Sequence, residues 1–197
     1  MTAAGPVLRL ARDADIDAMT EVMRASVLEL FPRFYDERQT ASAAVHVAHV
    51  DPTLVADGTY FVHEVAGEIV ACGGWSRRGR LYVGSGGHED DDRLLDPTME
   101  AAHIRAMFVR PDWTRRGLGR AILAAGHDAA RSEGFARLDL GATLPGVPLY
   151  RAFGFREIES FVVTMPDGVT LDALVMERTI DRVQRTHVRR SAPAPRR

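Results

Sequence analysis

The segment FVRPDWTRRGLGRAIL, residues 108–123, places the end of a strand, a glycine-containing loop and the start of a helix directly one after another. Residues 103–109 (HIRAMFV) are typical of a strand that stops before Pro111. Apolar residues at helical spacing then extend toward Gly134. Because the first N–H groups of a helix lack partners and its dipole attracts negative charge, this junction predicts an anion site.

Three arginines lie at the same helix start, namely Arg115, Arg116 and Arg120. They repel one another and are disfavoured by the helix dipole, a cost that an anion between them would offset. The alternative is a solvated, arginine-rich helix start with a glycine turn. Gly117 and Gly119 would let a ligand approach the backbone. The pattern lacks the ending of a Walker loop and the spacing of a dinucleotide fingerprint, so neither nucleotide fold is favoured.

The hydrophobic spacing elsewhere predicts the element order β-α-α-β-β-β-α-β-α-β-β. Residues 103–140 form a strand–helix–strand unit, which implies two neighbouring parallel strands with a right-handed crossover. The tight connections between the other strands imply antiparallel pairing, so we expect an α/β (α+β) mixed sheet with helices on its faces. The expected strands cover residues 7–11, 59–66, 68–76, 103–109, 135–141, 155–164 and 169–179, and the expected helices cover 13–30, 36–50, 116–133 and 149–153.

Charge divides the 197-residue chain into two parts. Residues 1–180 hold 19 arginines and 26 acidic residues, net −7, whereas residues 181–197 hold six arginines and one acidic residue, net +5. The chain contains no lysine, so all 25 basic residues are arginine. The length predicts one domain over 1–180, followed by a basic tail that we expect to be disordered.

Composition also excludes several classes of protein. No apolar run approaches the roughly 20 residues that a membrane-spanning helix needs, and the first residues lack the pattern of a signal peptide. A single cysteine, Cys72, leaves no internal disulfide and no cysteine-based metal cage, and its expected place is the sheet core. We therefore expect a cytoplasmic protein without a membrane partner or a metal.

The segment PLYRAFGF, residues 148–155, carries the second signal. Its short helix would present Tyr150 one turn before Gly154. A tyrosine of ordinary pKa, about 10, can give a proton to a leaving group of similar basicity. Taken alone, the same residue would more often be a packing tyrosine.

Together the two segments resemble the GNAT superfamily of acyl-CoA-dependent N-acetyltransferases. The resemblance covers roughly residues 6–180 and is most specific over 103–156. The family motif reads Gln/Arg-x-x-Gly-x-Gly/Ala, and here Thr114 takes its first place while Gly117 and Gly119 match. The family's YxxxGF element matches Tyr150, Gly154 and Phe155.

The resemblance implies a GNAT-like fold: a mostly antiparallel sheet whose central parallel pair splays apart, with helices on both faces. It also implies direct attack of a primary amine on acetyl-CoA in a ternary complex. Tyr150 would be the general acid, and a backbone N–H near Phe108 would stabilise the oxyanion. The residues that would hold the pyrophosphate are Arg115, Arg116, Gly117, Leu118, Gly119 and Arg120, and those beside pantetheine are Met107, Phe108 and Val109.

Four further positions follow from the resemblance less directly. Counting back from the glycine loop places His103 where some members carry a glutamate base, although a solvent-facing strand histidine is the alternative. Glu64 is a weaker candidate for the base. Arg105, two residues from His103 on the same strand face, could recognise a carboxylate of the substrate or form a structural ion pair. Thr143 stands where many members place a cofactor-contacting asparagine.

The sequence leaves the acceptor and the assembly open. Small-molecule and peptide amines both remain candidates, with their site expected near residues 26–40 and 77–100, and a homodimer is possible. The acidic run His88–Asp92 is expected to be a solvated loop rather than a cation site. No nucleic-acid partner is expected, although the arginine tail could act as a tether. The rival function is a non-catalytic acyl-CoA sensor with the same fold.

Overall fold

A computed structural model describes residues 5–79 and 93–180 of the chain, so the basic tail and the His88–Asp92 loop lie outside the described residues. The strands are β1 (Val7–Leu10), β2 (Tyr60–Val65), β3 (Glu68–Ser76), β4 (Ala102–Val109), β5 (Arg137–Thr143), β6 (Arg156–Thr164) and β7 (Thr170–Thr179). The helices are α1 (Ile16–Leu30), α2 (Glu37–His46), α3 (Pro52–Ala56), α4 (Leu118–Ser132) and α5 (Val147–Phe153). Short 3-10 turns include η2 (Phe31–Arg33), η4 (Pro111–Trp113) and η5 (Leu144–Gly146).

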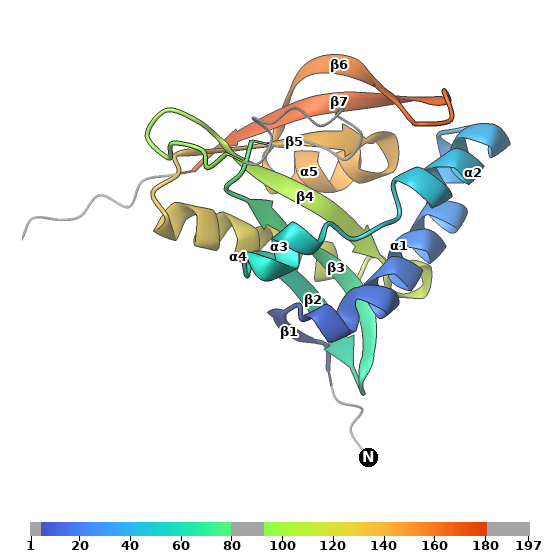
Figure 1. Cartoon of the computed structure of the whole chain (residues 1–197), viewed down its shortest axis with the longest axis horizontal. Coiled ribbons are helices and arrows are strands. Elements are labelled where there is room, and N and C mark those ends of the chain that lie inside the picture. The colour runs from blue at the N-terminus through green and yellow to red at the C-terminus, as the bar shows by residue number, and fades with distance from the viewer. Residues whose placement is uncertain (1–4, 80–92, 181–197) are drawn as a thin grey trace, which may run out of the picture.

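The strands form one sheet in the order β1-β2-β3-β4-β5-β7-β6, and Figure 1 shows the helices arranged around it. Only β4 and β5 pair in parallel among the described strands, and the other pairs are antiparallel. The mixed sheet and the parallel pair across a helical crossover, both predicted from sequence, are confirmed.

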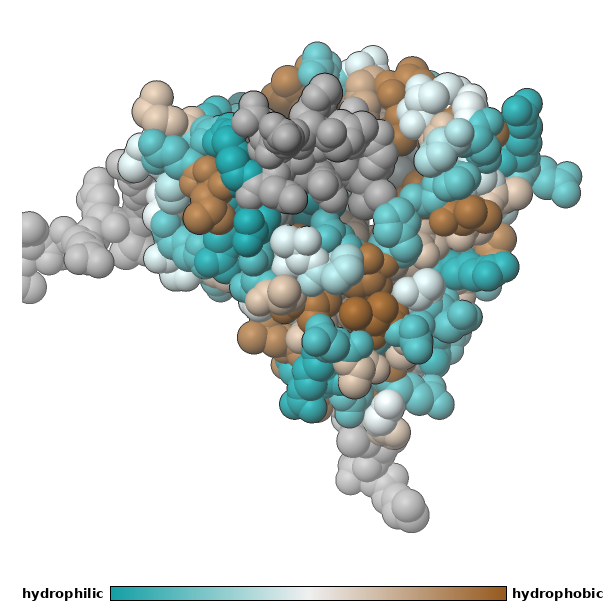
Figure 2. Space-filling view, in the orientation of Figure 1, coloured by the Kyte–Doolittle hydropathy of each residue, from teal (hydrophilic) through white to brown (hydrophobic). Residues whose placement is uncertain are grey.

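Two apolar layers cover the two faces of the sheet. On one face, Met19 and Val27 of α1 pack in a cluster with Val62 of β2, and α2 contributes Ala43. On the other face, α4 and α5 pack against the central strands through a second cluster that contains Leu123, Tyr150, Leu138 and Leu140. Figure 2 shows mostly hydrophilic residues on the visible surface, interrupted by a few apolar patches, as is usual for a folded domain.

The parallel pair opens almost as soon as it forms. Its ladder holds two residue pairs, Ala102 with Leu138 and His103 with Asp139. Beyond His103, the edge of β4 that faces β5 has no partner strand among the described residues, so the splayed pair expected from the resemblance is confirmed. The sheet therefore contains a gap at the ends of β4 and β5.

A β-bulge distorts β4 beside this gap. Arg105 pairs with Gly74 and Phe108 pairs with Cys72, so Ala106 and Met107 together lie opposite the single residue Gly73. Ala106 has a φ of 48°, which is rare for a residue with a side chain. A β-carbon at Gly73 would lie 2.3 Å from the sulfur of Met107 and 3.1 Å from its Cα, so a larger residue here would force Met107 to shift.

The predicted helix over 36–50 is wrong in its second part. The α2 helix ends at His46, and Asp51-Pro52 begins a new helix, α3, instead of only ending the previous one. The carboxylate of Asp51 accepts a hydrogen bond from the N–H of Thr53 at 3.0 Å. Proline suits the first helical position because its missing N–H would have no partner there. Within the described residues, no helix is both long and apolar enough to cross a membrane.

Candidate functional site

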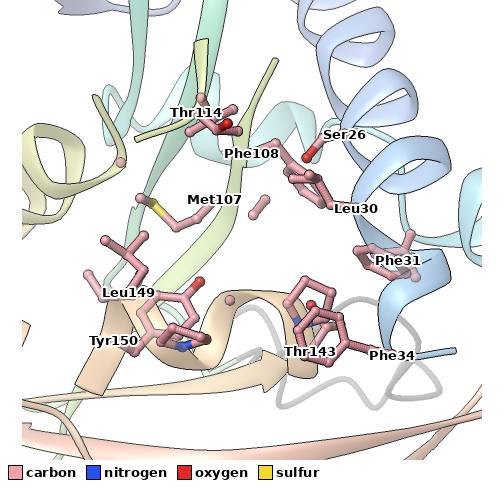
Figure 3. Close-up of a pocket in the computed structure, with 18 of the residues that line it drawn as sticks. Ser26, Leu30, Phe31, Phe34, Met107, Phe108, Thr114, Thr143, Leu149 and Tyr150 are labelled. Carbon is pink, nitrogen blue, oxygen red and sulfur yellow. The ribbon is translucent and has the colours of Figure 1, made fainter. Parts of the chain in front are cut away.

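A cavity of about 840 Å³ lies at the gap in the sheet. Figure 3 shows β4 passing through the middle of it, with Met107 and Leu149 on one side of the strand and Phe108 and Leu30 on the other. We call the first side the α4 half; its lining includes Met107, Val109, Arg115, Gly117, Leu118, Gly119, Arg120, Leu149 and Tyr150. We call the second side the α1 half; its lining includes Ser26, Glu29, Leu30, Phe31, Arg33, Phe34, Arg105, Phe108, Phe161, Val163 and Leu171.

The glycine loop shapes the α4 half at the start of α4. Gly117 precedes the helix with a φ of 84°, a left-handed conformation that disfavours residues with a β-carbon. A β-carbon added at Gly117 would meet nothing within 4 Å, so the space beside this backbone is open. By contrast, a β-carbon at Gly119 would lie 2.9 Å from the side chain of Leu149. One glycine thus provides space for a ligand, and the other lets α4 approach α5.

The three loop arginines occupy different surroundings. Arg115 and Arg120 line the cavity, and Arg120 also donates a hydrogen bond to the carbonyl of Ala152 at 3.3 Å. Arg116 does not belong to the described lining: its guanidinium stacks 4.4 Å from the ring centre of Trp113 and donates to the carbonyl of Asp112 at 3.1 Å. The structure therefore brings two of the three predicted cations to the cavity.

Tyr150 lies where the two halves meet. Figure 3 shows its hydroxyl directed into the cavity from α5. The side chain is 8% exposed, and burial raises its pKa above the ordinary value, so the phenol stays protonated. Its ring packs edge-on against Phe155 at 5.9 Å, and a β-carbon at Gly146 would lie 2.8 Å from it. The ring is thus a packing group, while its hydroxyl remains available to a ligand.

The bulge in β4 turns one peptide unit out of the ladder. The hydroxyl of Tyr60, which is 1% exposed, donates a hydrogen bond of 2.6 Å to the carbonyl of Ala106. In a planar trans peptide the N–H points opposite to the carbonyl. The N–H of Met107 therefore points away from Tyr60. Met107, Phe108 and Val109, which the resemblance places beside pantetheine, all line the cavity.

Neither predicted base lies in the described lining of the cavity. His103 is 8% exposed at the closed end of the strand pair, where its Nδ1 contacts the carboxylate of Asp139. It is therefore not solvent-facing, and it is not among the described residues that line the cavity. Glu64 forms an ion pair with Arg9 at 2.7 Å on β2. The geometry gives no support to either residue as a base.

Arg105 and Thr143 do line the cavity. Arg105 is 3% exposed, and its Nη2 lies 3.4 Å from the carboxylate of Asp51. This ion pair matches the structural alternative for Arg105, and it places part of the guanidinium's charge against an acid outside the cavity. Thr143 ends β5, where it pairs with Ala173 of β7.

Several lining residues of the α1 half were not singled out from sequence. They are Ser26, Glu29, Leu30, Phe31 and Phe34, and all fall within the broad range expected for an acceptor site. The aromatic run FPRFY at residues 31–35, directly after a helix, is the local signal that marks this region. None of the described residues among 77–100 contributes to the lining.

Neither Cys72 nor a metal-ligand cluster contributes to the described site. Cys72 is completely buried in the sheet, and burial raises the pKa of its thiol to about 12, so it is not a nucleophile. Within the ranges 5–79 and 93–180, no three metal-ligating side chains gather into a group that could hold an ion.

The known proteins that resemble this chain include GNAT acetyltransferases. A family model described as "Acetyltransferase (GNAT) domain" matches residues 56–157, just over half of the chain. No curated protein matches the sequence significantly.

Solved structures resemble the whole described fold. A GCN5-related N-acetyltransferase from Rhodopseudomonas palustris superposes with a TM-score of 0.68 at 20% identity, covering 91% of this chain and 98% of that one. PaiA N-acetyltransferase from Thermoplasma acidophilum, in complex with coenzyme A, gives 0.62 at 12% identity, covering 89% and 99%. YncA from Salmonella typhimurium, with acetyl-CoA, gives 0.59 at 20% identity, covering 97% and 99%.

Proposed function

This chain belongs to the GNAT family of acetyltransferases, and we propose that it transfers the acetyl group of acetyl-CoA to a primary amine by direct attack in a ternary complex. One observation carries the proposal. The open glycine loop before α4 and the hydroxyl of Tyr150 line the same half of the cavity, beside the unpaired edge of β4. This arrangement supports an anion site at the loop and a proton donor at Tyr150 within one cavity.

The α4 half fits acetyl-CoA. The first N–H groups of α4 and the guanidinium groups of Arg115 and Arg120 suit a pyrophosphate, for which the space beside Gly117 is open. The unpaired edge of β4 along Met107–Val109 offers main-chain groups to the amides of pantetheine. The thioester would then lie near the bulge and Tyr150.

The chain's residues then assist a simple substitution. The neutral amine nitrogen forms a bond to the thioester carbonyl carbon, the C–S bond breaks, and the sulfur leaves with its electron pair. The N–H of Met107, whose direction is set by the hydrogen bond from Tyr60 to the Ala106 carbonyl, would stabilise the oxyanion. Tyr150 gives its proton to the leaving thiolate and regains one from solvent. The proton that the amine loses passes to water, since neither His103 nor Glu64 is among the described residues that line the cavity.

The cofactor claim is tested by calorimetric titration with acetyl-CoA. We expect the intact protein to bind it and Gly117→Asp to bind it at least about tenfold more weakly, because a carboxylate replaces open space at the anion site. Gly168→Asp is the matched control: Gly168 also has a positive φ, 78°, and open space around it, but it lies in the β6–β7 turn outside the lining. Equal binding by both variants would overturn the claim.

Turnover separates the enzyme from the alternative, a non-catalytic acyl-CoA sensor. Release of free thiol is followed across chemically different amines, with acetyl-CoA binding measured in parallel. Acetylation of any amine supports the transferase. Tight acetyl-CoA binding without thiol release on any acceptor would support the sensor.

A further inference from the structure

We propose that the acceptor is a monoamine with an apolar body about the size of an aromatic ring, and that the α1 half binds this body. The inference rests on the proposed function and specifies its substrate class. The reaction is the same acetyl transfer: the amine nitrogen forms the new N–C bond, while the apolar body lies on the α1 side of β4.

The apolar character of the α1 half comes from four separate elements. Leu30 ends α1 and Phe31 and Phe34 follow it, while Phe161 and Val163 come from β6 and Leu171 from β7. Phe31 and Leu171 are 3% and 0% exposed, so they form a fixed floor. Phe34 is 46% exposed and stands at the rim, and Figure 3 shows it with Phe31 and Leu30 around the same space.

The charges of the α1 half argue against a polycation. Among the described residues that line the whole cavity, Glu29 is the single carboxylate. Arg33 and Arg105 line the same half, and Arg105 is partly offset by Asp51 outside the lining. Among the described lining residues, a substrate with several ammonium groups would meet one carboxylate and two guanidinium groups. A substrate with one amine on an uncharged body meets less of this repulsion.

The order of residues along β4 places the apolar floor next to the reacting atoms. Phe108 faces the α1 half, whereas Met107, its neighbour, faces the α4 half and carries the N–H proposed for the oxyanion. Burying apolar ligand surface against apolar side chains lowers the free energy of binding. A methylene-rich or aromatic body buries the most such surface. Ser26, which is 4% exposed and lines the same half, adds one hydroxyl for the amine nitrogen.

The first experiment measures binding directly, so that it is independent of turnover. The protein, saturated with CoA, is titrated with 2-phenylethylamine and with spermidine. We expect 2-phenylethylamine to bind at least about tenfold more tightly, because its ring is transferred from water to the apolar floor. Equal binding, or tighter binding of spermidine, would overturn the inference.

Variants locate the bound ring. Phe34→Ala should weaken 2-phenylethylamine binding about fivefold, since a half-exposed ring contributes only part of its contact area. Leu28→Ala is the matched control, because Leu28 lies on α1, is 48% exposed and is outside the described lining. Equal effects of the two variants would overturn the assignment to the α1 half.

Turnover on a panel distinguishes this inference from the proposed function. The panel holds 2-phenylethylamine, spermidine, kanamycin and an alanine-initiated peptide, each with acetyl-CoA. Preference for 2-phenylethylamine supports both the transferase function and the proposed substrate class. Preference for any other member overturns the substrate class but leaves the transferase intact. If none of the four amines causes thiol release, the proposed transferase function is contradicted. The binding titrations still show whether the α1 half binds an apolar amine.

Discussion

The two halves of the cavity present different parts of the polypeptide to their contents. The α4 half offers mainly backbone: the open loop at Gly117, the first N–H groups of α4 and the unpaired edge of β4. The α1 half offers mainly side chains, among them Phe31 and Phe34, collected from elements far apart in the sequence. One half is built by a single strand–loop–helix, and the other by α1, η2, β6 and β7.

This difference explains how the halves can vary. Backbone recognition depends on conformation, so it constrains glycines and spacing but leaves other side chains free to change. Side-chain recognition has no fixed spacing, and a single substitution changes what is bound. We expect the α4 half to keep its ligand under most substitutions, and the α1 half to change its preference with few of them.

The largest effect is expected at Tyr150, where the halves meet. Tyr150→Phe should lower kcat by about 10²-fold or more, because the variant removes the proposed proton donor while keeping the ring's packing. Binding of acetyl-CoA should be unchanged in calorimetry. In the wild-type enzyme kcat should stay level up to about pH 10, since burial raises the pKa of this acid and activity falls only above it. Full activity of Tyr150→Phe would remove the assignment.

A smaller effect is expected from Tyr60, which orients the bulge from the far side of β4. Tyr60→Phe leaves the carbonyl of Ala106 without its hydroxyl donor, and we expect kcat to fall about tenfold as the N–H of Met107 loses its fixed direction. The free energy of unfolding should fall by about 1–3 kcal/mol, the usual cost of an unpaired buried polar group. Loss of stability with unchanged kcat would assign Tyr60 a structural role only.

Gly146→Ala tests the placement of Tyr150 more gently. Gly146 has a φ of −81°, which alanine adopts without strain, so the main consequence is the new methyl group 2.8 Å from the Tyr150 ring. We expect kcat to fall several-fold, on the order of fivefold, because small misplacements of catalytic groups slow the chemistry. Titration with acetyl-CoA should show little change. A variant with wild-type kcat would mean that the ring tolerates displacement.

The smallest effect concerns stability at low pH, outside both halves. His63 on β2 is 5% exposed, and burial lowers its pKa below the ordinary value of about 6.5. Its contribution to stability is complete above that pH and is lost as pH falls toward the folded pKa, because the unfolded chain takes up the proton first. Denaturant titrations should show a lower free energy of unfolding at pH 5.5 than at pH 7.5. In His63→Phe, the His63 contribution to the fall in the free energy of unfolding between pH 7.5 and 5.5 should be absent.

Sequence reasoning reached the fold and the α4 half because both depend on local signals. The junction at 108–123 defines a parallel crossover, and the structure contains it with α4 beginning at Leu118. Gly117 and Tyr150 were predicted because glycine lets a ligand approach the backbone and because the spacing of the two segments matches a family, and both line the cavity. The sequence did not reveal the bulge at Ala106, since its conformation follows from the register of β3 against β4.

The rest depended on tertiary contacts. His103 was placed by counting, but its surroundings were decided by Asp139, which lies opposite it only after β5 pairs with β4. Phe161 and Leu171 belong to the α1 half because the β6–β7 hairpin returns past the gap, which no spacing along the chain predicts. Asp51-Pro52 shows the limit of local signals too, because the same two residues can end one helix or begin the next.

The two-rung ladder between β4 and β5 has a thermodynamic consequence. The sheet consists of two parts, β1–β4 and β5–β7–β6. They are joined at one end by the residue pairs Ala102–Leu138 and His103–Asp139. A ligand lying along the open edge of β4 would supply the missing rungs. At a concentration 100 times its Kd it would add about 2.7 kcal/mol to the free energy of unfolding. The backbone amides at the free ends of both strands should then exchange hydrogen more slowly. Their exchange rates should therefore fall as the ligand concentration rises.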